Sequence, residues 1–240
     1  YETAALLEAA LPTVKDAVPK PLESAARWLQ YMAGFGITAT SEMTYSTSML
    51  KGYEALTTRP DSPVRMSLYH MAIDSDAGVQ VDSPDPSMLR KQGVKLWADG
   101  SPWVGSIASS FPYLDSPAVQ KAQIPLGPGG TAMMNYTRVE LDALLAKYAP
   151  MGWQMAFHVN GDVGLDIVLD AYEEALVDNN LMGTDHRWRV EHCGGCRGDQ
   201  FVRAVAMGVT ISLGPFQYIY WGDLLDGTMF PPEIGSQWMR

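Results

Sequence analysis

Two histidines at the ends of successive strand patterns are the residues best placed to do chemistry. His158 ends an apolar run and precedes a glycine-containing turn and a long amphipathic helical pattern. His192 ends a second such run and again precedes a glycine turn, 34 residues further along the chain. That spacing suits one βαβ repeat of about 30 or more residues. Because parallel strands bring their carboxyl ends to one edge, the pattern predicts a metal site in which two imidazoles bind one ion.

The charge and composition of the chain exclude several classes of partner. A formal net charge of −10 would repel nucleic acid and an anionic membrane, so a small neutral or cationic substrate is favoured. No apolar run approaches the roughly 20 residues that cross a bilayer, and two cysteines cannot form a multi-disulfide scaffold. With 240 residues and 47% hydrophobic content, the chain can bury a sizeable core. A cytoplasmic location is favoured.

Helix and strand patterns alternate along the sequence. Strands are expected near 35–40, 64–73, 93–100, 152–158, 187–192 and 209–213. Helices are expected at 1–11, 22–34, 46–57, 137–148, 162–178 and 199–207, with at most a short helix at 84–92. Six strands alternating with helices predict an α/β fold, either a parallel sheet or a TIM-type (β/α)8 barrel that is two strands short of closure.

The segment 101–136 is too long to be a simple connector, since loops beyond about 12–15 residues are usually functional or disordered. We expect it to act as a lid over the carboxyl ends of the strands and to contact the aromatic segment near Tyr218. Phe216, Tyr218, Tyr220 and Trp221 lie in the loop predicted after the last strand. Core packing would explain these rings, but a loop on this face also favours their contact with an apolar or aromatic substrate group.

Five stretches stand in a specific order and spacing: Gly36-Ile-Thr-Ala-Thr40, Val94-Lys-Leu-Trp-Ala-Asp-Gly-Ser101, His158-Val-Asn-Gly-Asp162, Arg187-Trp-Arg-Val-Glu-His192 and Gly208-Val-Thr-Ile-Ser212. Together they resemble the amidohydrolase superfamily, and within it the amidohydrolase-3 branch of N-substituted formamide deformylase-like hydrolases. In that superfamily a His-x-His pair on the first strand, a lysine on the fourth, histidines on the fifth and sixth, and an aspartate on the eighth surround one or two divalent metals.

The resemblance implies that the six strands are the second to the seventh of such a barrel. Residues 1–240 are therefore expected to be an internal part of one metal-dependent hydrolase barrel domain. The first and eighth strands, with the His-x-His pair and the aspartate, and the small β-sandwich of the family are expected to be absent from them.

The same resemblance implies that His158, His192 and Lys95 are metal ligands, with zinc as the expected divalent ion. Lys95 also stands out by itself, because a strand lysine between Val94 and Leu96 costs several kcal/mol to bury unless it is paired or neutralised. In the family this amine is carboxylated to a carbamate that bridges two metals. The alternative is a lysine whose amine reaches Asp99 or solvent.

Several neighbouring residues allow more than one interpretation. Asp99 shares a strand face with Lys95 and is expected in the substrate pocket, although a turn-forming role explains it equally well. Asp162 is expected to cap the helix that follows it. Glu191 is expected to point away from the site, because side chains alternate along a strand. The two histidines could themselves be separate, hydrogen-bonded core residues.

The other histidines and the two cysteines are expected to lie outside the metal site. His186 precedes His192 by six residues, which is about 20 Å along an extended strand. His70, alone near a strand end, is more often a packing residue. Cys193 and Cys196 form a C-x-x-C pattern that can lower a thiol pKa, but no second C-x-x-C is present and a hydrolase turn is favoured.

These observations lead to one expected function and two alternatives. We expect a metal-dependent amidohydrolase that cleaves a C–N bond of a small amide-like substrate, N-acyl or N-formyl, with metal-activated water. The resemblance places the general base on the absent eighth strand, so little hydrolytic activity is expected from residues 1–240 alone. The alternatives are a non-catalytic binding or regulatory barrel and a thiol redox protein. Unpaired edge strands also favour a homo-oligomer.

Overall fold

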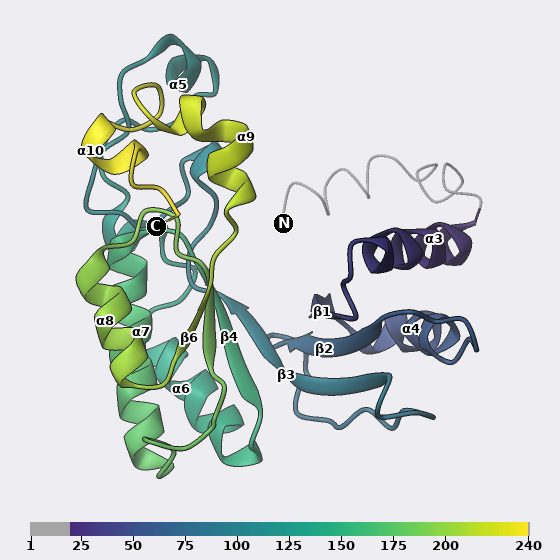
Figure 1. Cartoon of the computed structure of the whole chain (residues 1–240). Coiled ribbons are helices and arrows are strands. Elements are labelled where there is room, and N and C mark those ends of the chain that lie inside the picture. The colour runs from purple at the N-terminus through teal and green to yellow at the C-terminus, as the bar shows by residue number, and fades with distance from the viewer. Residues whose placement is uncertain (1–19, 240) are drawn as a thin grey trace. The chain divides into compact units, whose positions relative to one another are not determined.

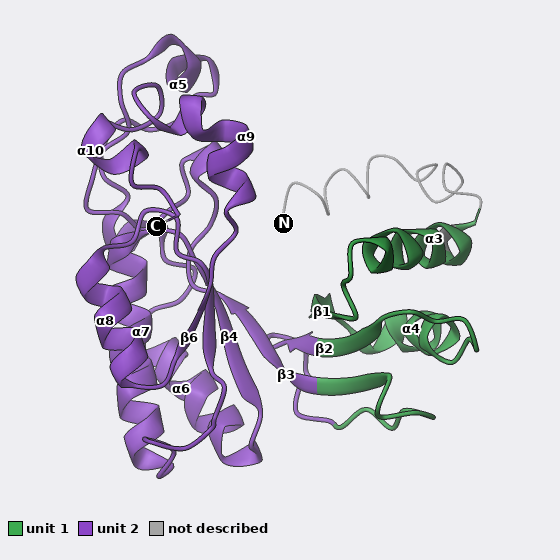
Figure 2. Cartoon of the chain, in the orientation of Figure 1, with its two compact units in different colours: residues 1–68, 80–91 green, residues 69–79, 92–240 purple. Residues whose placement is uncertain are grey.

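The computed structural model describes residues 20–239, so the helix expected at 1–11 lies outside the described residues. The chain divides into two compact units, residues 1–68 with 80–91 and residues 69–79 with 92–240 (Figure 2). Within the described part of the chain, six strands form one sheet whose order follows the sequence, β1-β2-β3-β4-β5-β6 (Figure 1).

The six predicted strands and the α/β class are confirmed. The strands are β1 (Ala39–Tyr45), β2 (Arg65–Met71), β3 (Leu89–Trp97), β4 (Gln154–Val159), β5 (Arg189–His192) and β6 (Thr210–Ser212). Strands β3 to β6 pair in parallel with their neighbours, and helices connect them. Parallel strands in sequence order with helical crossovers are the arrangement of an incomplete TIM-type barrel, as the sequence predicts.

The first unit has its own apolar core beneath two helices, α3 (Pro21–Gly34) and α4 (Leu50–Thr57), the latter preceded by the 3-10 turn η1 (Thr47–Met49). Proline suits the first position of α3 because its missing N–H needs no partner there. Both predicted helices are confirmed. Their core contains Leu29, Tyr45, Leu56, Val64, Met66, Leu68 and Leu89.

Strand β1 begins at Ala39, later than predicted, because the preceding residues close helix α3. The Phe35 N–H donates to the Met32 carbonyl at 3.0 Å, and the Gly36 N–H donates to the Ala33 carbonyl at 2.9 Å. Gly36 has a φ of 82°, a left-handed conformation that glycine adopts at little cost and that ends helices.

Residues 84–92, expected to form at most a short helix, make a single turn and then enter β3, which begins earlier than predicted. The carbonyl of Asp85 accepts hydrogen bonds from Met88 N at 3.0 Å and Leu89 N at 2.9 Å. The Asp85 carboxylate also accepts from Ser87 N at 2.9 Å, which closes the turn locally. Leu89 then packs into the core of the first unit, so the chain continues as a strand.

In the second unit, helices α6 (Arg138–Tyr148), α7 (Asp162–Asp178) and α8 (Gly198–Ala206) gather on one side of strands β4 to β6 (Figure 1). The predicted capping box of α6 is present, since Thr137 and Glu140 each accept a backbone N–H of the other.

No helix among residues 20–239 combines the length and the hydrophobicity needed to cross a membrane. The remaining elements of this unit are η2 (Pro102–Val104), α5 (Pro117–Lys121), η3 (Gly130–Met133), η4 (Ala149–Met151), α9 (Phe216–Leu225) and α10 (Pro232–Gly235).

The two faces of this part of the sheet differ in chemistry. Leu96, Phe157 and Val190 face the helices and are fully buried. The alternate positions form the opposite face, which we call the inner face. On it the register places Trp97 beside His158 and His158 beside Glu191. Because side chains two residues apart on a strand share a face, Lys95 belongs to the inner face too.

The segment 101–136 packs at the carboxyl ends of β3 and β4, as expected of a lid. Gly164 in the first turn of α7 donates its N–H to the Ala108 carbonyl at 3.0 Å. The ring of Trp103 lies 4.8 Å from that of Trp221 in α9. This segment shares a second apolar core with α9 and α10, formed by Ile107, Phe111, Tyr113, Val119, Ile124, Leu225, Met229, Phe230, Trp238 and Met239.

Candidate metal centre

The structure brings the two predicted histidines together. Their ring centroids lie 4.6 Å apart in an edge-to-face arrangement, at the carboxyl ends of β4 and β5. Rings at this separation can turn their nitrogens toward a common ion, given that zinc–nitrogen bonds are about 2.0–2.1 Å long. The ring contact places both side chains within reach of one ion, and their role as metal ligands stays a prediction.

His192 reaches this position because the strand changes direction at its last residue. The register pairs His192 with Val159, whose side chain is buried against the helices, so regular alternation would point His192 away from His158. The backbone of His192 has a φ of 76° and that of Cys193 a φ of 53°. Two successive left-handed residues without glycine are costly, and such strain gathers at functional sites.

The hydrogen bond of His158 defines which of its nitrogens can bind a metal. Nε2 lies 2.7 Å from the carbonyl oxygen of Gly100. A contact this short needs a hydrogen on Nε2, since two lone pairs would repel, so Nδ1 carries the free lone pair. A ligand histidine that donates its other N–H to a carbonyl is the usual outer-shell arrangement of metal sites.

Both imidazoles are held in the neutral form that metal ligands require. Burial, with smaller contributions from the nearby His192 and Lys95, lowers the pKa of His158 to about 3, against the opposing effect of the Gly100 carbonyl. Burial also lowers the pKa of His192, again with a contribution from Lys95. The lone pairs of both rings are therefore available at neutral pH.

Lys95 supplies a buried amine with no hydrogen-bond partner. Its side chain is 3% exposed, and Nζ lies 5.1 Å from the centre of the Trp97 ring. Burial lowers the pKa of Lys95 to about 7, while the charge of Glu191 opposes that shift. The alternative of an amine that reaches Asp99 or solvent is not what the structure shows. An unpaired buried amine calls for a compensating group.

The expectation that Glu191 points away from the site is wrong. The left-handed turn occurs after Glu191, so Glu191 keeps its place beside His158 on the inner face while His192 rotates toward it. The Glu191 carboxylate forms an ion pair with Arg189, and the Arg189 guanidinium also reaches Ser212 Oγ at 3.2 Å. Glu191 therefore pairs directly with Arg189, and its negative charge favours the protonated form of Lys95.

Asp99 is fully buried and serves as the junction between the lid and the β4–α7 turn. Its carboxylate accepts the backbone N–H of Ala108 at 3.1 Å, of Asn160 at 2.9 Å and of Gly161 at 2.7 Å. Burial raises the pKa of Asp99 to about 7, although the three donors favour the carboxylate. A side-chain Cβ at Gly161 would lie 2.0 Å from the Ala108 carbonyl oxygen, so only glycine fits this approach. These contacts favour the turn-forming alternative for Asp99.

Substitution of Asp99 by asparagine is expected to destabilise the protein by about 2 kcal/mol. An amide can present its oxygen to two of the three N–H donors, but its NH2 group then faces the third, and an unsatisfied buried donor costs about 1–3 kcal/mol. Urea denaturation measures the change. Asp115→Asn, at an exposed position of the same lid, is the control. An unchanged midpoint for Asp99→Asn would contradict the role assigned to this carboxylate.

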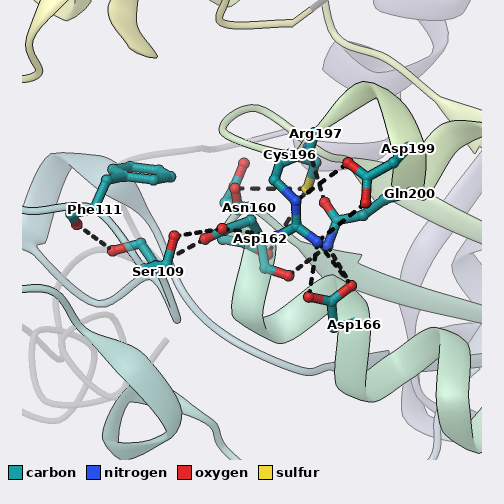
Figure 3. A network of polar contacts seen from close by, with 11 residues as sticks. Ser109, Phe111, Asn160, Asp162, Asp166, Cys196, Arg197, Asp199 and Gln200 are labelled. Carbon is teal, nitrogen blue, oxygen red and sulfur yellow. Dashed lines mark hydrogen bonds and ion pairs between the residues drawn. The ribbon is translucent and has the colours of Figure 1, made fainter. Parts of the chain in front are cut away.

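Asp162 does not cap its own helix, contrary to the prediction. It occupies the first position of α7, Gly161 is the N-cap, and no side chain caps this helix. The buried carboxylate instead accepts Ser110 N at 2.8 Å and pairs with Arg197 Nη1 at 2.9 Å (Figure 3). Arg197 also contacts Asp166 and Asp199, so the network joins the lid to α7 and α8.

The aromatic segment is a helix, α9, and not the loop that was expected. Phe216, Tyr218, Tyr220 and Trp221 are 47%, 47%, 77% and 40% exposed, respectively. The ring of Phe216 lies 5.5 Å from that of Trp221, which in turn contacts the lid. Their place in a substrate pocket stays a prediction.

The two cysteines are free thiols next to the centre. Cys193 is buried, and its N–H donates to the Val159 carbonyl at 2.8 Å. Burial raises the pKa of the Cys196 thiol well above its usual range, and a hydrogen bond with Cys193 adds to the effect. A thiol that stays protonated is a poor nucleophile, which disfavours the redox alternative.

Asn160 is a functional candidate that the sequence reasoning did not single out. Its Nδ2 donates to the Gly100 carbonyl at 2.9 Å, beside the Nε2 of His158 at 3.1 Å. Its Oδ1 is buried and has no hydrogen-bond partner, so it can accept from a bound molecule. The sequence spacing could have identified Asn160, because a residue two positions after His158 lies on the same side of an extended strand.

Comparison with known proteins places the chain in a family. The amidohydrolase-3 model, described as the amidohydrolase family, matches residues 2–237. The chain belongs to the amidohydrolase family. The resemblance seen in the five sequence stretches is thereby confirmed.

The individual proteins that match this chain share only limited sequence identity with it. The N-substituted formamide deformylase of Arthrobacter pascens is 27% identical over 153 residues, which are 63% of this chain and 25% of that protein. An uncharacterized metal-dependent hydrolase from Pyrococcus horikoshii OT3 superposes with a TM-score of 0.66 at 23% identity, over 89% of this chain and 40% of that one. Its counterpart from Pyrococcus furiosus gives a TM-score of 0.66 at 22% identity, over 89% and 41%. The two structures show a common fold, and the chain spans about a quarter of the curated relative's length.

Proposed function

We propose that the protein is a metal-dependent hydrolase that cleaves a C–N bond of an amide-like substrate. The observation that carries the proposal is the convergence of His158 and His192, with rings 4.6 Å apart, beside the buried amine of Lys95. Membership of the amidohydrolase family supports the reaction class.

The donor set fits a divalent metal. His158 Nδ1 and the neutral His192 ring offer lone pairs, and the Lys95 amine has no other hydrogen-bond partner. We assign the metal to these three side chains, and zinc matches the imidazole ligands best. A bound divalent ion would polarise the substrate carbonyl and supply hydroxide at neutral pH.

Lys95 is suited to carboxylation. With a pKa of about 7, a large fraction of its amine is uncharged at neutral pH and can attack carbon dioxide. The new N–C bond forms as the amine gives up a proton, and the product is an anionic carbamate. Such an anion would replace an unpaired buried amine with oxygen ligands for one or two metal ions.

For the substrate class we propose N-formyl or N-acyl amines. The name of the Arthrobacter relative describes removal of formyl groups from N-substituted formamides. Asn160 Oδ1 could accept the amide N–H of such a substrate, since it is buried and unpaired. The exposed rings of α9 suit an apolar or aromatic N-substituent.

Screens of N-formyl and N-acyl amines with residues 1–240 and with a chain extended at both ends test the proposal. We expect zinc in both proteins and hydrolysis mainly by the extended chain, with loss of hydrolysis after chelation and recovery when zinc is restored. Bound zinc in the extended chain without hydrolysis of any member would instead indicate a binding or regulatory protein. Activity that survives chelation, together with a reversible disulfide between Cys193 and Cys196, would indicate thiol chemistry.

A further inference from the structure

A second cluster of possible ligands lies on β2 and the turn that follows it. His70 Nε2 is 3.2 Å from Asp74 Oδ2 and 3.3 Å from Asp76 Oδ1. One ligand atom from each of the three residues can be chosen so that all lie within 4.8 Å of one another. His70 was expected to be a lone packing residue, but it faces two carboxylates.

This cluster is separate from the candidate metal centre. Tyr69 donates its hydroxyl hydrogen to Gln154 and stacks beneath the guanidinium of Arg189, which places it on the inner face. His70 is the next residue on the same strand, so its side chain points to the opposite face.

The separations match the edges of a coordination polyhedron. With metal–ligand bonds of about 2.1 Å, two ligand atoms are about 3.0 Å apart at a right angle and about 3.4 Å apart at the tetrahedral angle. The two distances from His70 Nε2 lie between these values. These two distances therefore suit coordination of one ion, and the chosen oxygens of Asp74 and Asp76 lie within 4.8 Å of each other.

The burial of the three side chains also suits an ion. The imidazole is 1% exposed, which fixes its orientation, whereas the carboxylates of Asp74 and Asp76 are 34% and 43% exposed. Solvent therefore reaches the carboxylate side of the cluster, where an ion could enter and keep water ligands. Two carboxylates and one neutral imidazole carry a charge of −2, which a divalent cation balances.

We propose that His70, Asp74 and Asp76 form a second metal site for a divalent transition-metal ion such as zinc. Imidazole nitrogen favours zinc over calcium or magnesium, which prefer oxygen ligands throughout. An ion held there joins the turn that contains Asp74 and Asp76 to the end of β2. This site does not depend on the hydrolase function proposed above.

Zinc titration of the chelator-treated protein tests the proposal by calorimetry. We expect the wild type to bind one more zinc ion than Asp74→Asn/Asp76→Asn, or to bind it at least tenfold more tightly. Calcium should not compete. The matched control is Asp178→Asn, an exposed carboxylate at the end of α7, which should bind as the wild type does. Because the readout is the difference between these proteins, it holds whether or not the His158 centre binds metal.

A measurement on the wild type alone covers the case in which the double variant folds poorly. Zinc should shift the ring resonances of His70 in NMR spectra, and manganese should broaden them. Ring signals that do not respond to saturating zinc would overturn the proposal, as would equal stoichiometry and affinity in the double variant. The cluster would then be a buried histidine hydrogen-bonded to two carboxylates.

Discussion

Replacement of Lys95 by methionine is expected to raise the free energy of unfolding of the metal-free protein by several kcal/mol at pH 6. The pKa of the amine falls from an ordinary value of 10.5 to about 7 on burial, a shift that corresponds to roughly 5 kcal/mol. Methionine fills a similar volume without a charge and loses only the contact with the Trp97 ring, about 0.5–2 kcal/mol.

The pH dependence gives this prediction its sign. Between pH 7 and 10.5 the unfolded chain binds more protons at Lys95 than the folded protein does, so the free energy of unfolding rises with pH in this window. Below pH 7 both states are protonated and the full cost of burial remains. We therefore expect the advantage of Lys95→Met to shrink as the pH rises from 7 toward 10.5.

Urea denaturation at pH 6, 8 and 10 measures both effects. The exposed Lys121, replaced by methionine, is the control and should change little at any pH. Zinc affinity of Lys95→Met should fall, so that stability and metal binding move in opposite directions. A variant less stable than the wild type at pH 6 would show that the amine is compensated within the folded protein.

The positions of His158 and His192 at strand ends could be predicted because strand patterns are local. An apolar run that ends in a histidine before a glycine turn predicts the end of a strand, and His158 and His192 lie at such ends. The direction of the His192 side chain could not be predicted from the alternation of side chains along a strand. That alternation assumes an extended backbone, whereas His192 has a left-handed backbone conformation. The same error moved Glu191 to the wrong face.

The role of Asp99, the start of β3 and helix α9 could not be predicted because they depend on long-range contacts or lack a clear hydrophobic pattern. The carboxylate of Asp99 binds N–H groups 9, 61 and 62 residues away, and no local pattern encodes such an approach. The first residues of β3 include Arg90, Lys91 and Gln92, which carry none of the apolar character that marks a strand. Helix α9 follows Pro215 with rings spread over its surface, so no apolar stripe distinguishes it from a loop.

Replacement of His158 by glutamine is expected to weaken zinc binding at the candidate centre by at least about 100-fold. Loss of an outer-shell partner alone typically costs 10–100-fold in metal affinity, and His158 is proposed as a ligand itself. Glutamine can still donate a hydrogen bond to the Gly100 carbonyl that His158 Nε2 contacts at 2.7 Å, but it has no counterpart to the Nδ1 lone pair.

The free energy of unfolding measured in the presence of zinc reports the same loss of zinc binding without an activity assay. At a free zinc concentration of 100 times Kd, one site adds about 2.7 kcal/mol to the free energy of unfolding, and His158→Gln should forfeit nearly all of it. His186→Gln is the matched control, because His186 bonds to the Met207 carbonyl and Trp188 N on another part of the chain. Its zinc-dependent stabilisation should equal that of the wild type. If His158→Gln and His186→Gln responded to zinc alike, metal would not bind at His158, and the convergence of the two rings would have to be explained by packing alone.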